Sequence, residues 1–140
     1  MTNDTHRRAN RSMPDAAVIP VLACADAAAA ADWLVRAFGF VERLRIGTHR
    51  IQLTFGDGAV VLAARSDAIE PRGISLMVRV ADVDAHCAHA RAAGARIVAE
   101  PATFPYGERQ YSAVDPSGYL WTFSGSVADV DPVDWGGELR

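Results

Sequence analysis

Apolar and polar residues alternate along several short segments of this chain, while two other segments carry apolar residues three and four positions apart. Alternation rich in aromatic and β-branched residues is typical of strands, and the wider spacing is typical of helices. The clearest alternation runs through residues 106–124, where Trp121 and Phe123 are separated by polar positions. At its centre, Asp115 to Gly118 has the residues of a type I turn. This stretch predicts a β-hairpin with one aromatic face to bury and one polar face.

The same order of elements occurs twice along the chain. Asp26 precedes a helix expected at residues 27–37 and Asp82 precedes one that ends near residue 93, since Asp is a good N-cap. Strands are expected at residues 18–23, 40–46, 49–55 and 59–64 in the first half, and at 74–80, 96–99 and within 106–124 in the second. Neither half has enough apolar residues for its own core, so the two should pack together. The pattern predicts an α+β fold of two βαβββ modules that form one curved mixed sheet around a cup.

These boundaries predict a single structural domain with an extension at each end. Residues 1–17 are expected to be a flexible N-terminal arm, 18–64 the first module, 65–73 a linker, 74–124 the second module and 125–140 a C-terminal tail. Within the second module, residues 100–105 are bounded by prolines and are expected to form a loop. Trp135 is expected to anchor the tail to the surface.

Composition limits the classes of partner. The chain has 140 residues, of which 50% are hydrophobic and 22% charged, as in ordinary globular domains. The net charge is −3 and no basic stripe is present, so we expect no nucleic-acid partner. No apolar stretch has the length of a membrane span. Cys24 and Cys87 are predicted to be buried free thiols, which indicates a reducing, cytoplasmic location.

Several segments together resemble a known family. They are residues 20–26 with Trp33 and residues 37–39, then residues 80–84, and finally residues 106–109 with 115–118 and 121–123. With the duplicated βαβββ pattern, they resemble the vicinal oxygen chelate superfamily, which contains glyoxalase I, extradiol dioxygenases and bleomycin-resistance proteins. The resemblance covers residues 18–124 and is more specific for the fold than for any one reaction.

The resemblance also implies where a metal would bind. Family enzymes hold a divalent ion with His, Gln or Glu side chains from the first and last strand of each module. The corresponding positions here are Ile19 or Pro20, Ala63 or Ala64, Ser75, and Thr122. None offers the carboxylate, imidazole or thiolate that a divalent ion prefers. We therefore expect no metal and no other cofactor.

Polar residues on the predicted cup strands are the candidates for ligand contact. They are His49, Gln52, Ser75, Arg79, Tyr106, Arg109, Tyr111 and Thr122. Arg109 stands between aromatic residues at the mouth of the cup, where it would clamp a carboxylate or planar ligand or pair with Glu108 or Asp115. His49 is either a polar wall, a general base or a surface residue at a strand end.

Other chemically capable residues have simpler interpretations. His86 and His89 have the spacing of a metal pair, but with only Asp82 nearby in sequence they are better interpreted as a solvated helix face. Trp33 and Trp121 are interpreted as core residues.

The leading hypothesis is a metal-independent protein that binds a small organic molecule in the cup, as in drug or metabolite sequestration, and that forms a homodimer. The alternative is a glyoxalase-type lyase or isomerase for a small carbonyl compound, with metal ligands outside the mapped positions. A third hypothesis is a regulatory protein that uses only its outer surface. Whether the chain is an enzyme stays open, and the residues favour a binder.

Overall fold

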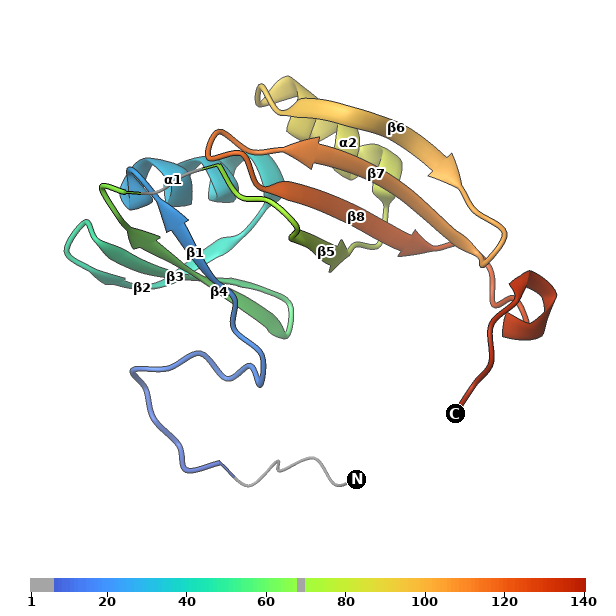
Figure 1. Cartoon of the computed structure of the whole chain (residues 1–140), viewed down its shortest axis with the longest axis horizontal. Coiled ribbons are helices and arrows are strands. Elements are labelled where there is room, and N and C mark those ends of the chain that lie inside the picture. The colour runs from blue at the N-terminus through green and yellow to red at the C-terminus, as the bar shows by residue number, and fades with distance from the viewer. Residues whose placement is uncertain (1–6, 68–69) are drawn as a thin grey trace.

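The computed structural model describes residues 7–67 and 70–140, which form two similar modules (Figure 1). The first module contains β1 (Val21–Cys24), α1 (Ala27–Phe38), β2 (Val41–Ile46), β3 (Arg50–Phe55) and β4 (Gly58–Ala64). The second contains β5 (Ser75–Arg79), α2 (Val83–Ala92), β6 (Arg96–Thr103), β7 (Glu108–Val114) and β8 (Leu120–Ser126). A short 3-10 helix, η1 (Pro132–Trp135), lies in the tail. The predicted α+β fold of two βαβββ modules is confirmed.

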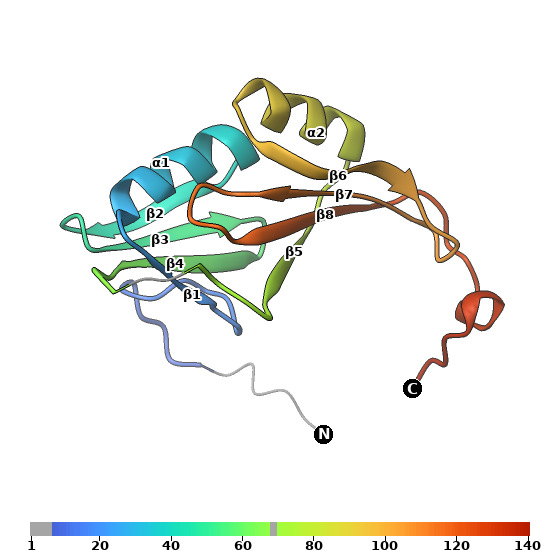
Figure 2. The same cartoon turned by 45° about the horizontal axis from the view of Figure 1, so that its top comes forward.

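The strands do not form one curved sheet, as the sequence predicted, but two four-stranded sheets with equivalent orders, β1-β4-β3-β2 and β5-β8-β7-β6. In each sheet the first strand pairs in parallel with the last strand of its module, and the remaining pairs are antiparallel. Helices α1 and α2 contact each other, each packed against its own sheet (Figures 1 and 2). Neither helix of the described chain has the length and apolar character that a bilayer crossing requires.

Both helices begin as the sequence predicts. The Asp26 carboxylate accepts a hydrogen bond from the backbone N–H of Ala29 at 3.0 Å, and Asp82 accepts one from Ala85 at 3.0 Å. These bonds satisfy backbone donors that the first helical turn leaves without partners. Gly39 ends α1 with a φ of +84°, a conformation that glycine adopts without strain.

Aromatic side chains join the modules into one core. The ring of Phe38, at the end of α1, lies 4.7 Å from that of Phe123 and 5.9 Å from that of Trp121, measured between centroids. Both β8 side chains are fully buried. The predicted core role of Trp121 is confirmed, and Trp33 packs edge-on against Phe38 at 4.8 Å. The two predicted free cysteines, Cys24 and Cys87, are also buried.

His86 does not belong to a solvated helix face, as the sequence suggested. Its Nε2–H donates to the Phe38 carbonyl at 2.8 Å, which leaves Nδ1 to accept from the Tyr111 hydroxyl at 2.5 Å. A carbonyl oxygen only accepts, so this contact fixes the tautomer. Burial lowers the pKa of His86 and favours the neutral ring. His86 therefore connects α1, α2 and β7, whereas His89 is exposed and contacts the Arg36 carbonyl.

Strand β6 continues through Pro101, where the sequence predicted a loop. The pairing of β6 with β7 shifts register between Ala99 and Ala102. Proline has no N–H to donate to a ladder and is accommodated at such irregularities. The strand pairs again at Ala102 and Thr103, so β6 reaches the far end of β7.

Candidate functional site

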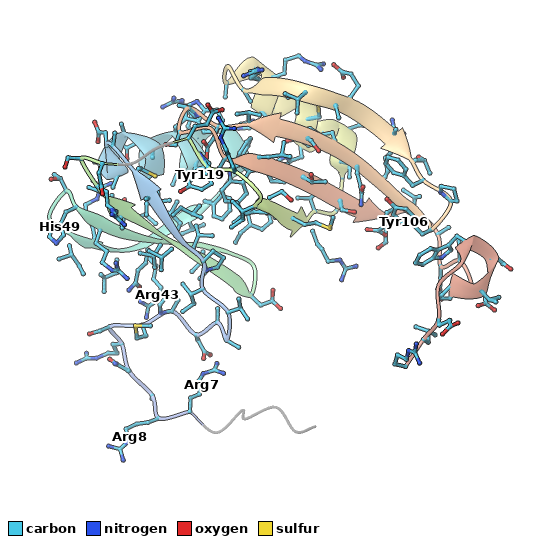
Figure 3. The ribbon with its side chains drawn as sticks, viewed as in Figure 1. Arg7, Arg8, Arg43, His49, Tyr106 and Tyr119 are labelled. Carbon is cyan, nitrogen blue, oxygen red and sulfur yellow. The ribbon has the colours of Figure 1, made fainter. Side chains whose placement is uncertain are left out.

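The first sheet has contacts on both faces. One face packs against α1, and the segment before β1 passes below the other, which it contacts at Arg11 and Ser12 (Figure 1). The Gln52 side chain on β3 is only 5% exposed, because its Nε2 donates to the Ser12 carbonyl at 2.8 Å. Its Oε1 accepts from Arg43 at 2.7 Å, and Arg43 also donates to the Arg11 carbonyl at 3.0 Å (Figure 3). Arg43 and Gln52 thus attach the arm, which was expected to be flexible, to this sheet.

The second sheet has a face that points away from its buried aromatic side chains and carries mainly polar residues. We call it the open face. It contains Ser75, Met77 and Arg79 of β5, Glu108, Gln110 and Ser112 of β7, and Thr122, Ser124 and Ser126 of β8. The intervening positions carry the core side chains, as period-two alternation requires.

The polar side chains of the open face bond to one another across β7 and β8. The hydroxyls of Ser112 and Thr122 lie 2.8 Å apart. Gln110 donates to the Ser124 hydroxyl at 3.0 Å, and that hydroxyl donates to the Glu108 carboxylate at 2.7 Å. Hydroxyl and carboxamide groups both donate and accept, so this surface can exchange its internal bonds for bonds to a polar small molecule.

Glu108 is the negative charge of the open face. Hydrogen bonds from the Ser126 and Ser124 hydroxyls, together with the nearby charge of Arg79, lower the pKa of this carboxyl. Arg79 itself donates to the Ser126 hydroxyl at 3.2 Å. The face therefore presents a carboxylate and a guanidinium at the same end, beside Tyr106, whose hydroxyl donates to Gln110 at 3.3 Å.

Sequence reasoning missed Glu108 as a site residue and treated it only as a partner for Arg109. The alternation that places Tyr111 and Ala113 in the core also places Glu108 beside Gln110 on the other face. The alternation of residues in the sequence was therefore sufficient to place Glu108 on the open face.

Four of the eight predicted site residues lie on the open face or at its end. Ser75, Arg79 and Thr122 are on the face itself, and Tyr106 lies where β7 begins (Figure 3). Gln52 lies on the first sheet, under the arm. His49 is exposed in the turn between β2 and β3, on the other module (Figure 3).

Arg109 and Tyr111 point to the opposite side of β7. The sequence placed Arg109 at the mouth of the cup, but its guanidinium forms a two-pronged ion pair with Asp84 of α2, at 3.0 and 2.9 Å. It pairs with neither Glu108 nor Asp115, because alternation along β7 directs it towards α2. Tyr111 is 1% exposed, and burial raises the pKa of its hydroxyl.

Three hollows larger than about 400 Å³ lie near the two sheets in the described part of the chain. A groove of about 910 Å³ separates α1 from the turn at residues 115–118. An apolar cleft of about 410 Å³, lined by Phe55, Met77 and other side chains, lies between the modules. A third hollow, of about 560 Å³, adjoins Glu108 at the end of the open face.

The residues at the positions where the family holds a metal do not fit a divalent ion. Thr122 shares a hydrogen bond with Ser112, and the equivalent position on β4, Ala63 or Ala64, has no donor atom. Glu108 is a single carboxylate among hydroxyls and amides. Within residues 7–67 and 70–140, no three His, Cys, Asp or Glu side chains gather in a metal-binding arrangement.

Comparison with solved structures finds the same fold in many proteins. TioX from Micromonospora sp. ML1 is 35% identical, with a TM-score of 0.67 over 81% of this chain and 98% of its own. TnmS3 from Streptomyces sp. CB03234, described as an antibiotic binding protein, is 26% identical, with a TM-score of 0.65 over 77% of this chain and 93% of its own. A glyoxalase/bleomycin resistance protein/dioxygenase family enzyme from Burkholderia phytofirmans PsJN shares the fold at 20% identity, with a TM-score of 0.68 over 77% and 96%.

No functionally curated protein matches this sequence significantly. A family model does match, over residues 17–123, which include both α-helices, strands β1 to β7 and the first part of β8. The chain belongs to the Glyoxalase/Bleomycin resistance protein/Dioxygenase superfamily.

Proposed function

We propose that this protein binds a small organic molecule without a metal, and that the open face of the second sheet is the floor of its site. The observation that carries the proposal is the row of cross-bonded polar side chains on a face whose β5 side chains and Ser126 are exposed to solvent. Sites for small molecules combine apolar walls with a few placed polar groups. The similarity to TnmS3, described as an antibiotic binding protein, supports a role in drug or metabolite sequestration.

The residues that would contact the ligand follow from this placement. Ser75, Arg79, Tyr106 and Thr122 remain the proposed contacts, and Glu108 and Gln110 join them. Gln52, His49, Arg109 and Tyr111 lie outside this face and have no role in the proposed site.

We also propose that a second copy of the chain encloses the site. Strands β1 and β5 each pair on one side only among the described residues, so each presents an unpaired edge. Apolar side chains are exposed beside these edges: Met77 at 65%, Val21 at 54% and Ile74 at 49%. Their burial in a homodimer would remove them from water and give the open face a wall. Light scattering should show a dimer, and Met77→Glu should convert it to monomer.

A cytoplasmic location is proposed on the basis of the cysteines. Cys24 and Cys87 are separate buried thiols in the structure. Free thiols persist in reducing compartments.

The decisive test combines binding with metal removal. Small organic compounds that raise the thermal midpoint would be measured by calorimetry before and after EDTA treatment, with elemental analysis of the purified protein. Thr122→Val with Ser112→Ala keeps the shape of the face and removes two hydroxyls. We expect affinity to fall about tenfold, the equivalent of one or two lost hydrogen bonds. Thr54→Val on the first sheet is the control and should leave affinity unchanged.

Two outcomes would contradict this function. Binding that disappears with EDTA, or metal present in stoichiometric amount, would favour the glyoxalase-type enzyme. Unchanged affinity in the Ser112/Thr122 double variant would place the ligand elsewhere.

A further inference from the structure

The C-terminal tail forms a capped turn that holds a half-exposed tryptophan. The Asp131 carboxylate accepts from the Val133 N–H at 3.1 Å, and Pro132 occupies the first position of η1. Gly136 ends the turn with a φ of +92°. Trp135, the largest side chain of this element, is 44% exposed and contributes nothing to the core. A turn with caps at both ends therefore orients an aromatic ring that folding buries only in part.

The tail is attached to the second module at Gly107. The backbone N–H groups of Val127 and Ala128 donate to the Gly107 carbonyl, at 2.8 and 3.3 Å. A Cβ at position 107 would lie 2.2 Å from the Ala128 carbonyl oxygen, and φ there is +81°. Only glycine permits this close approach, so a side chain at position 107 would displace the tail.

The attached tail completes an aromatic hollow at the end of the open face. The ring centroids of Trp135 and Tyr106 lie 5.4 Å apart, and Phe104 stacks on Tyr106 at 5.6 Å with 6° between the planes. The hollow of about 560 Å³ is lined by Tyr106, Pro132 and Trp135 together with Glu108, Ser126 and Asp129. Aromatic and acidic groups thus face the same space.

The charge of this corner is negative. Glu108 and Asp129 both line the hollow, and no basic residue does. Residues 127–140 contain four acidic residues and one arginine, a net charge of −3. Arg79 is the nearest cation that these contacts identify: it does not line the hollow, and its guanidinium reaches from β5 to Ser126 at the edge.

We propose that Tyr106, Trp135 and Glu108 form a subsite for a flat aromatic group that carries a positive charge, such as an arylmethyl ammonium. The rings would stack on the aromatic part, and the carboxylate would pair with the cation, which the ring faces also attract. The inference rests on the proposed function, since the subsite continues the open face at Glu108. It adds the class of ligand and a contribution from the tail, which lies beyond the residues that the family model matches.

Three probes of one shape and different charge test the proposal. They are 2-naphthylmethylammonium, 2-naphthylmethanol and 2-naphthoate, titrated by calorimetry and by tryptophan fluorescence. We expect the ammonium to bind at least tenfold more tightly than the carboxylate, about the effect of a partly shielded charge pair. Glu108→Gln should remove the preference for the ammonium over the alcohol.

Two variants test the contribution of the tail. Trp135→Ala removes the ring, and Gly107→Ala displaces the tail without altering any lining side chain. Each should weaken the ammonium probe about tenfold. Val133→Ala, on the same turn but outside the hollow, is the matched control and should bind as the parent does. The thermal midpoint of Gly107→Ala shows whether this variant is folded. Trp135→Ala tests the contribution of the tail independently, through an exposed residue whose loss should not unfold the chain.

Equal affinities for the three probes, or no binding of any of them, would overturn the proposal. Full affinity in Trp135→Ala would also overturn it. If the ligand site depends on Ser112 and Thr122 but not on Trp135, the function proposed above stands and this subsite fails. If the probes depend on Trp135 and Glu108 but not on Ser112 and Thr122, the subsite stands and the sheet is not the floor of the site.

Discussion

The face of the first sheet that points away from its helix is covered by the N-terminal arm, while the equivalent face of the second sheet is open. Both sheets have the same strand order, so topology does not explain the difference. The side chains do. On the first sheet, Gln52 and Arg43 bond to backbone carbonyls of the arm. On the second, Gln110 and Ser124 bond to each other within the sheet.

This comparison shows how a duplicated module can serve two purposes. In the first copy the polar groups fasten a segment of the same chain, which contributes to stability. In the second copy the polar groups satisfy one another, and a ligand can compete for them. The two hairpin turns also differ in how far their acidic side chains are buried. The β7–β8 turn holds a buried carboxylate, whereas the β3–β4 turn, with Asp57 between two glycines, is exposed.

Removing the buried carboxylate should have the largest effect. Asp115 accepts hydrogen bonds from the N–H groups of Ser117 and Tyr119 and from the Trp121 indole, at 2.8, 3.0 and 2.9 Å. In Asp115→Ala these donors lose their partner, two of them in buried surroundings, and we expect the free energy of unfolding to fall by about 3 kcal/mol. Urea denaturation at neutral pH measures the change.

The matched variant in the first module is Asp57→Ala. Its side chain is exposed, so the expected loss is within about 0.5 kcal/mol. If the free energy of unfolding falls by a similar amount in both variants, the two hairpin turns are stabilised in the same way and the modules do not differ there.

The second prediction concerns the contact between the modules. His86→Leu leaves the Tyr111 hydroxyl and the Phe38 carbonyl without partners, and should cost about 2 kcal/mol at pH 8. His89→Leu, on the same helix but exposed, should change stability far less. Comparable losses in the two variants would mean that His86 does not hold the modules together.

The pH dependence gives an independent measurement of the same residue. Because burial lowers the native pKa of His86, the unfolded chain binds its proton more readily than the folded chain does. Its contribution to stability is therefore complete above about pH 6.5 and is lost as the pH falls from there towards the native pKa. Urea midpoints between pH 5 and 8 should show this loss in the parent and in His89→Leu, but not in His86→Leu.

The sequence predicted most of the fold because the fold depends on local signals. Period-two alternation, the N-caps Asp26 and Asp82 and the turn from Asp115 to Gly118 all act within a few residues. The site was harder to predict, because its contacts join distant segments. Gln52 meets Ser12 forty residues away, and Arg109 meets Asp84 twenty-five away. Glu108 is the exception, since the alternation along β7 was enough to place it.

The third prediction tests the attachment of the arm. Gln52→Ala removes the bonds to Ser12 and Arg43 and should lower the free energy of unfolding by about 1 kcal/mol. It should also release the arm, so that trypsin cleaves after Arg11 faster than in the parent. Gln110→Ala removes a glutamine from the other sheet and should leave the cleavage rate unchanged. Equal rates in both variants would show that Gln52 does not hold the arm.

The smallest effect is expected at Arg109, which is adjacent to Glu108 on β7 but faces α2. Its ion pair with Asp84 is exposed to solvent, and such pairs contribute little to stability. Arg109→Ala should therefore leave ligand affinity within about twofold of the parent, because the side chain points to the opposite side of β7 and bonds to Asp84 and Thr103. Glu108→Gln alters the neighbouring position, whose side chain lies on the open face, and should reduce affinity for the ammonium probe. Measured side by side, the two variants determine which face of β7 contacts the ligand. If Arg109→Ala lowers ligand affinity and Glu108→Gln does not, the ligand binds on the α2 side, and Arg109 lies at the mouth of the site as the sequence predicted.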